Sequence, residues 1–189
     1  MTAVTETVAF TQMKDGTKED YDLLLRADTG DRQFVADNAL ALLGQMAGDA
    51  HGYQIDRYQH SLQTATRALR DGADEETIVC AVLHDIGDML APSNHSELAA
   101  AVLRPYVSEE NHWIVKHHGA FQGYYFFHHR GGDRNAREAY RGAAHFEACV
   151  HFCEAWDQAS FDPAYDTLPL EAFEPMVRAV FARNPAGFA

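Results

Sequence analysis

The strongest constraint on the fold is a polar pair, His84-Asp85, that directly follows an apolar run from Ile78 to Leu83. Charged side chains are unfavourable in such a buried setting unless they are paired or bound to a metal ion. Asp74 is suited to cap the start of this run, and Gly87 coincides with its end. The segment therefore predicts a buried helix that ends in two potential metal ligands.

Other amphipathic runs are separated by short breaks rich in Gly, Pro and Asp. Apolar residues recur at helical spacing in seven further places, beginning at 23–25 and continuing at 35–46, 58–69, 95–103, 113–118, 146–157 and 170–181. In the late run, Phe146, Val150, Cys153 and Asp157 form one stripe, and Gly119 is expected to end the run before it. No convincing alternating strand or repeat is visible. We predict an all-α fold, a helical bundle in one domain over 19–189, preceded by an N-terminal arm at 1–18.

Composition narrows the classes of partner. The chain carries 28 Asp plus Glu against 15 Lys plus Arg, a formal net charge of −13. Such a surface repels a phosphate backbone, so no nucleic-acid partner is expected. No membrane partner is expected either, because no signal peptide or membrane span is visible. The three cysteines lie in apolar sequence and are interpreted as buried thiols, which suits a cytoplasmic protein.

Four histidines and two aspartates form a series that can hold two metal ions, namely His60, His84, Asp85, His95, His118 and Asp157. Neutral imidazole together with carboxylate suits iron, manganese or zinc. A carboxylate can bridge two ions, whereas an imidazole binds one. Taken singly, each residue also has a simpler interpretation: His84-Asp85 as a solvated helix end and Asp157 as a hydrogen-bonded structural aspartate.

Taken in order, His60, His84-Asp85 and Asp157 resemble the H…HD…D signature of the HD-domain superfamily. Its members are all-helical, divalent-metal proteins, mostly phosphohydrolases. The segments 115–121 and 156–162 are similar to the second histidine pair and the last metal ligand of myo-inositol oxygenase. The chain from His60 to Asp157 looks still closer to the small bacterial HD oxygenases that cleave hydroxylated organophosphonates.

This resemblance implies a dinuclear metal site in the core of the bundle. Asp85 would bridge the ions and be the catalytic residue; His60, His84 and Asp157 would complete one site, and His95 and His118 the other. His117 competes with His118, which is preferred because Lys116 then stands two places before the ligand. The implied cofactor is two Fe ions in a mixed-valent Fe(II)/Fe(III) state, with O2 as co-substrate.

Asp88 bears on the substrate. Similar inositol oxygenases have a lysine there and some phosphonate oxygenases a histidine, whereas an acidic side chain favours a cationic group. Aromatic faces attract quaternary ammonium, although most aromatic residues pack structurally. We therefore expect a zwitterionic phosphonate, first 1-hydroxy-2-(trimethylammonio)ethylphosphonate, giving glycine betaine and phosphate, and next its unmethylated amino analogue. The residues expected to contact it are Asp88, Tyr53, Tyr58, Lys116, Gln122, Tyr124, Arg134 and Trp156, with Arg130 a further candidate.

Two other functions stay open. Two close divalent ions can activate water for attack on a nucleotide or small phosphate ester, which would make the protein an HD-family phosphohydrolase. Against it, no Gly-rich phosphate loop is evident, and the GYP motif of cyclic-dinucleotide HD phosphodiesterases is missing. A catalytically silent, regulatory metal-binding protein is the third function, but such a protein has no need of both sites.

Overall fold

The computed structural model describes residues 6–28 and 32–185, and within these ranges it contains helices and no strand. The all-α prediction is therefore confirmed. The α-helices are α1 (Lys18–Asp28), α2 (Arg32–Gln45), α3 (Arg57–Arg70), α4 (Glu75–Leu83), α5 (His95–Leu103), α6 (Glu109–Phe126), α7 (Phe146–His151) and α8 (Glu174–Phe181). A π-helical segment, η4 (Phe152–Asp157), follows α7, and short 3₁₀ turns are η1 (Met13–Asp15), η2 (Phe127–Arg130), η3 (Ala136–Tyr140) and η5 (Leu170–Ala172).

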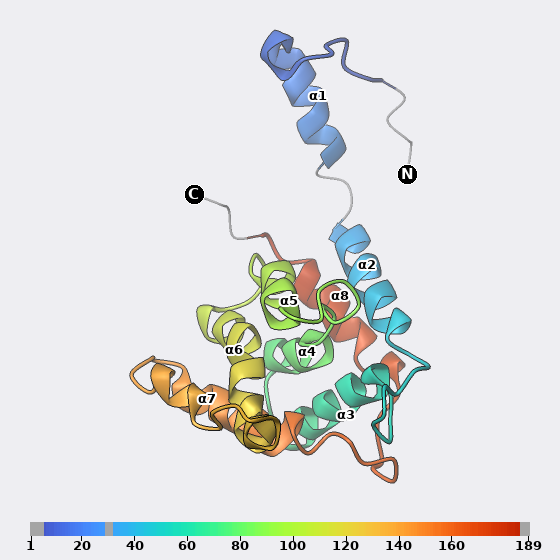
Figure 1. Ribbon diagram of the computed structural model, residues 1–189. Helices are drawn as coiled ribbons and strands as arrows, with labels where there is room; N and C mark the ends of the chain where they lie inside the picture. Colours follow the sequence, from blue (N-terminus) through green and yellow to red (C-terminus); the bar gives the residue numbers. More distant parts are fainter. Residues whose placement is uncertain (1–5, 29–31, 186–189) are drawn as a thin grey trace.

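Helix α4 lies in the middle of the bundle and packs against α3, α6 and α8 (Figure 1). Its residues Ile78 to Leu83 are all buried, as their apolar character predicts. Asp74 caps the helix by accepting a hydrogen bond of 2.8 Å from the backbone N–H of Thr77, as expected from the sequence. The chain therefore enters α4 at a fixed point and leaves it at His84-Asp85, deep inside the molecule.

The N-terminal region is set apart from this bundle. Figure 1 shows α1 away from the other helices. The ring of its Tyr21 packs on Phe10 at a centroid distance of 5.6 Å. The first five residues of the arm expected at 1–18 lie outside the described residues. Within the described ranges, no helix is long and apolar enough to cross a membrane.

Helix α6 continues past Gly119, where the sequence predicts its end, and runs to Phe126. Both glycines in this stretch serve close packing. A Cβ on Gly119 would lie 2.8 Å from Ser96 Oγ, and one on Gly123 would lie 2.2 Å from the ring of Phe127. The prediction is wrong because a glycine in a helical pattern marks either a helix end or a close approach, and spacing alone does not separate the two.

Candidate metal centre

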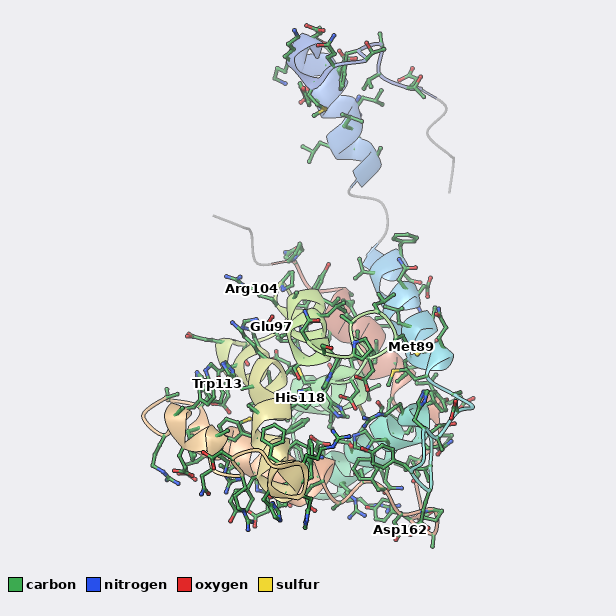
Figure 2. All side chains as sticks on the ribbon, in the orientation of Figure 1. Met89, Glu97, Arg104, Trp113, His118 and Asp162 are labelled. Carbon is green, nitrogen blue, oxygen red and sulfur yellow. The ribbon has the colours of Figure 1, made fainter. Side chains whose placement is uncertain are left out.

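The six expected ligands come from five parts of the bundle and converge at its centre. His60 lies on α3, the pair His84-Asp85 directly follows α4, His95 begins α5, His118 lies on α6, and Asp157 ends η4. All are buried except His95, whose side chain is 24% exposed. Figure 2 shows His118 in the interior beside α4, whereas Arg104 and Asp162 lie at the edge of the bundle.

Three ligands form what we call the enclosed half of the centre: His60, His84 and Asp157. The Nε2 atoms of His60 and His84 lie 3.2 Å apart. Asp157 Oδ1 lies 3.2 Å from His60 Nε2 and 3.8 Å from His84 Nε2. These atoms surround one point from three sides, as the ligands of a single ion do.

His95 and His118 form what we call the open half. Asp85 Oδ1 lies 3.4 Å from His95 Nε2 and 3.2 Å from His118 Nε2. The other oxygen, Asp85 Oδ2, lies 3.5 Å from Nε2 of both His60 and His84. The two oxygens of Asp85 therefore face the two halves, which is the arrangement of a bridging carboxylate.

Each of the four histidines uses its Nδ1 to hold the ring in place. A backbone carbonyl can only accept a hydrogen bond, so Nδ1 carries a proton and Nε2 is the nitrogen left for a metal ion. The Nδ1–O distances are 2.8 Å from His60 to Ser160, 2.8 Å from His84 to Ala81, 3.1 Å from His95 to Pro92 and 2.7 Å from His118 to Val115. All four Nε2 atoms point to the centre, ready to bind a metal.

Two further observations fit a metal ion. With both Nδ1 atoms donating, the lone pairs of His60 Nε2 and His84 Nε2 face each other at 3.2 Å, which is repulsive unless a cation lies between them. In the described residues, Asp157 Oδ2 is buried and has no hydrogen-bond partner, an unfavourable state that a metal ligand does not suffer. The donor set of imidazole and carboxylate suits a divalent transition metal.

The ionisation of the cluster also suits metal binding. Burial lowers the pKa of His84 to about 4, so this ring is neutral, as a ligand must be. Burial acts against the charged form of Asp85, but the adjacent imidazoles of His84 and His118 outweigh it and lower the pKa of Asp85. Burial opposes the charged form of His118, yet its contact with Asp85 outweighs burial and raises its pKa to about 9. An incoming ion would therefore replace a proton held by His118.

Asp157 reaches the centre through a distortion of its helix. The backbone N–H of Gln158 donates to the carbonyl of Cys153, five residues earlier, at 3.0 Å. The predicted stripe faces the core, with Phe146, Cys153 and Asp157 buried and Val150 partly buried against it, and the π-helical turn adds Cys149 and Phe152 to the buried face. π-Helical turns are rare and occur frequently at functional sites, because they shift the side chains that follow.

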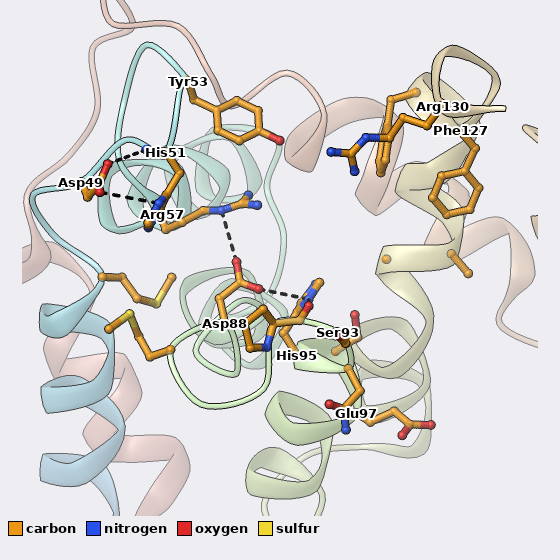
Figure 3. A pocket seen from close by; sticks show the side chains of 18 of the residues that line it. Asp49, His51, Tyr53, Arg57, Asp88, Ser93, His95, Glu97, Phe127 and Arg130 are labelled. Carbon is orange, nitrogen blue, oxygen red and sulfur yellow. Dashed lines mark hydrogen bonds and ion pairs between the residues drawn. The ribbon is translucent and has the colours of Figure 1, made fainter. Parts of the chain in front are cut away.

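An inner chamber of about 280 Å³ adjoins the open half. Its walls include Asp85, His95, His118 and Asp157, but not His60 or His84. Four aromatic side chains complete them, from Tyr53, Tyr125, Phe126 and Phe161. The chamber shares Tyr53, Arg57, His95, Gly119 and Phe126 with an outer groove of about 1530 Å³ (Figure 3). A small molecule can therefore approach the open half from outside.

The structure brings three of the expected substrate contacts to these cavities. Tyr53 lines both, and its ring stacks on Phe161 at 5.0 Å. Gln122 lines the inner chamber and donates from Nε2 to Asp157 Oδ1 at 2.9 Å. Asp88 lines the outer groove, but its oxygens are not free: Oδ2 lies 3.2 Å from Arg57 Nε and Oδ1 lies 3.1 Å from His95 Nδ1. Arg130, the further candidate, also lines the outer groove.

The other expected contacts line neither cavity. Trp156 donates from Nε1 to Asp71 Oδ2 at 3.0 Å, and Tyr58 packs against the core. The guanidinium of Arg134 lies 4.3 Å from the ring centre of Tyr124, and Lys116 is exposed. His117, the competitor of His118, stacks on Trp113 at 4.2 Å, outside the cluster.

Arg57 is the functional residue that sequence reasoning missed. Among the described residues that line the inner chamber, it is the only Arg or Lys. Its Nη1 lies 3.5 Å from Asp85 Oδ2, and its side chain spans the chamber and the outer groove. A signal was present: Arg57 precedes His60 by three residues, which places both on one face of α3.

Comparison with known proteins agrees with this geometry. No curated protein matches the chain. The family model described as HD domain matches residues 57–157, more than half of the 189-residue chain. All six ligand positions lie within the match. The chain belongs to the HD-domain family.

Proposed function

We propose that this HD protein is an O2-dependent di-iron oxygenase that cleaves the carbon–phosphorus bond of a 1-hydroxy-2-ammonioethylphosphonate. The first candidate substrate is 1-hydroxy-2-(trimethylammonio)ethylphosphonate. One hydroxyphosphonate and one O2 would give one carboxylic acid, glycine betaine, and one phosphate, so that atoms balance without a further reductant. When bound, two Fe ions in a mixed-valent Fe(II)/Fe(III) state would supply the redox chemistry with O2.

The observation that carries this proposal is the position of Asp85 between two imidazole pairs. Its two oxygens face His60 and His84 on one side and His95 and His118 on the other, at 3.2–3.5 Å. Such a set can hold two ions and leaves the open half with few protein ligands. The inner chamber adjoins that half, where a substrate hydroxyl and O2 would need coordination positions.

The chamber walls support a zwitterionic substrate. Tyr53, Tyr125, Phe126 and Phe161 offer aromatic surface for a trimethylammonium group. Arg57 is suited to the phosphonate, since a guanidinium can bind two of its oxygens at once. The aromatic walls are better suited to the cationic end than Asp88, whose oxygens already pair with Arg57 and His95.

We further propose that the reaction takes place in the cytoplasm, with only the phosphonate and O2 as partners. Cys80, Cys149 and Cys153 are buried and free, which suits a reducing compartment. Burial raises the pKa of the Cys80 and Cys153 thiols and keeps them unreactive.

The test is turnover with and without O2. The protein is purified anaerobically, its iron is counted, and electron paramagnetic resonance is recorded for a coupled Fe(II)/Fe(III) pair. With ¹⁸O2, the proposal expects phosphate release together with one labelled oxygen in the carboxylate of glycine betaine. Full activity under strict anoxia would contradict it.

A phosphohydrolase is the second candidate, and Arg57 is the observation that favours it. A guanidinium close to the bridging Asp85 would equally well hold a phosphate ester against two redox-inert ions. In that case Mn²⁺-loaded or Zn²⁺-loaded protein would release phosphate from a nucleotide or small phosphate ester without O2. The same anoxic assay therefore separates the two functions.

A further inference from the structure

We propose that Asp88 is a positioning residue that orients His95 and thereby sets the metal affinity of the open half. The enclosed half fills first, and the open half holds the exchangeable ion. This inference rests on the proposed two-metal function. It assigns to Asp88 a task at the centre itself rather than in substrate binding.

His95 is the least secured of the four imidazoles. Its side chain is 24% exposed, whereas those of His60, His84 and His118 are 1%, 0% and 3% exposed. It begins α5 behind Asn94, whose side chain makes no capping hydrogen bond. Its Nδ1 lies 3.1 Å from the carbonyl of Pro92, longer than the 2.7–2.8 Å bonds that tether the other three rings. Packing alone therefore does not fix this ring.

Asp88 supplies the missing restraint. Its Oδ1 lies 3.1 Å from His95 Nδ1, and its Oδ2 lies 3.2 Å from Arg57 Nε (Figure 3). Arg57 in turn lies over the ring of Tyr53 at 5.1 Å. A carboxylate on the far nitrogen of a histidine ligand orients the ring and makes its other nitrogen a stronger donor. Arg57 thus fixes one oxygen of Asp88, and the other oxygen contacts His95.

Gly87 allows a close approach to the backbone of His95. A Cβ at Gly87 would lie 2.2 Å from the carbonyl oxygen of His95 and 2.7 Å from its Cα. Only glycine permits this approach between the turn after α4 and the start of α5. The turn that supplies the bridging Asp85 therefore also supplies the contacts that place His95.

The two halves consequently differ in the number of ligands and in how rigidly those ligands are held. The enclosed half has three buried ligands of its own besides Asp85. The open half has two, one of which depends on Asp88 for its orientation. With fewer ligands and a less rigid ring, the open half binds its ion more weakly, and the open coordination positions face the inner chamber.

Titration of the metal-free protein with Co²⁺ alone tests the inference, by calorimetry and visible absorption. Wild-type protein should bind two ions per chain in two steps. Asp88→Ala should leave the first step within about twofold and weaken the second by about 10–100-fold. Asp88→Asn keeps an oxygen beside His95 Nδ1 while removing the charge, and should lose less. Asp49→Asn is the matched control, because Asp49 lines the same outer groove but pairs with His51; both steps should stay as in wild type.

Two results would overturn the inference while leaving the two-metal function intact. One is two wild-type steps of equal affinity, and the other is an Asp88→Ala protein whose second step is unchanged or whose first step weakens as much. If Asp88→Ala does not fold, Asp88→Asn replaces it and must weaken the second step more than the first. Failure of wild-type protein to bind any Co²⁺ would overturn the two-metal function as well.

Discussion

The enclosed and open halves of the centre share Asp85 but are built differently. In the enclosed half, the ligands come from α3, the end of α4 and η4. Of these described residues, Asp157 lines the inner chamber, whereas His60 and His84 line neither the chamber nor the outer groove. In the open half, His95 and His118 line the inner chamber. The same ligand chemistry therefore lies once away from the cavities and once at the wall of the inner chamber.

This difference follows from what surrounds each ligand. His60 lies in the first turn of α3, where its buried ring packs on Phe161 at a centroid distance of 4.4 Å. His95 is the first residue of its helix, where neighbours are fewer. On the proposal made above, the more exposed His95 therefore depends on Asp88, whose Oδ1 lies 3.1 Å from its Nδ1.

Removing Asp85 should have the largest effect, because it abolishes the feature that the two halves share. Asp85→Ala is expected to weaken both metal-binding steps by more than about 100-fold and to abolish turnover. The measurement is metal content per chain after dialysis against buffered free metal. Unchanged occupancy of both halves would remove the bridging assignment of Asp85.

Substitution of single histidines should affect the two metal-binding steps separately. His60→Ala is expected to eliminate the first binding step, and His95→Ala only the second. In the metal-free protein, the fully buried His60 should also cost more unfolding free energy, about 2–4 kcal/mol against less than about 1 kcal/mol for His95→Ala. Urea unfolding in the presence of a chelator measures this, and equal losses for the two variants would contradict the distinction.

Gln122 should matter to the enclosed half alone. Its Nε2 donates to Asp157 Oδ1 at 2.9 Å and fixes that carboxylate. Gln122→Leu is expected to weaken the first step by about 10-fold. Gln158→Leu is the matched control, since Gln158 lines the same chamber but donates to the carbonyl of Glu154. An equal effect of the two substitutions would show that chamber polarity, not Asp157, is responsible.

Much of the centre could be predicted from the order of residue types. His60, His84-Asp85 and Asp157 carry the family signature, and the second histidine pair follows it. Imidazoles and carboxylates in apolar helices are unfavourable unless they are paired or bind an ion, so their recurrence along the chain indicates a metal site. The preference for His118 over His117 also agrees with the structure, which places only His118 in the cluster.

The chamber could not be predicted to the same extent, because helix register decides which side chains enter it. Tyr124 is the tyrosine expected there, but Tyr125 lines the chamber, one residue and about 100° further around α6. Trp156 turns to Asp71 within the π-helical segment, which no regular helical pattern anticipates. The pairing of Asp88 depends on Arg57, 31 positions earlier, and pairings of this kind are not visible in local sequence.

A third polar cluster, at Glu76, contrasts with both halves of the centre because hydrogen-bond donors alone satisfy it. Glu76 Oε1 accepts from Ser108 N at 2.7 Å and Asn111 Nδ2 at 2.9 Å, and Oε2 pairs with Arg183. Burial acts to raise the pKa of Glu76, but these bonds outweigh it and lower the pKa from 4.5 to about 2. The carboxylate therefore ties α4 to the start of α6 without a metal.

The smallest expected effect is the pH dependence of this contribution. Because the folded-state pKa of Glu76 lies below the ordinary value, its stabilisation is fully present above about pH 4.5 and is lost as the pH falls toward 2. Glu76→Gln should therefore cost about 1–2 kcal/mol of unfolding free energy at pH 7, and the difference from wild type should shrink between pH 4.5 and pH 2. Glu147→Gln, at a side chain that is 82% exposed, should stay within about 0.5 kcal/mol of wild type throughout. Urea unfolding of the metal-free proteins gives both curves. The histidines and aspartates of the metal centre are the same in all three proteins, so their own pH dependence cancels in the comparison. A Glu76→Gln difference that does not change with pH would show that the charge of the Glu76 carboxylate contributes nothing.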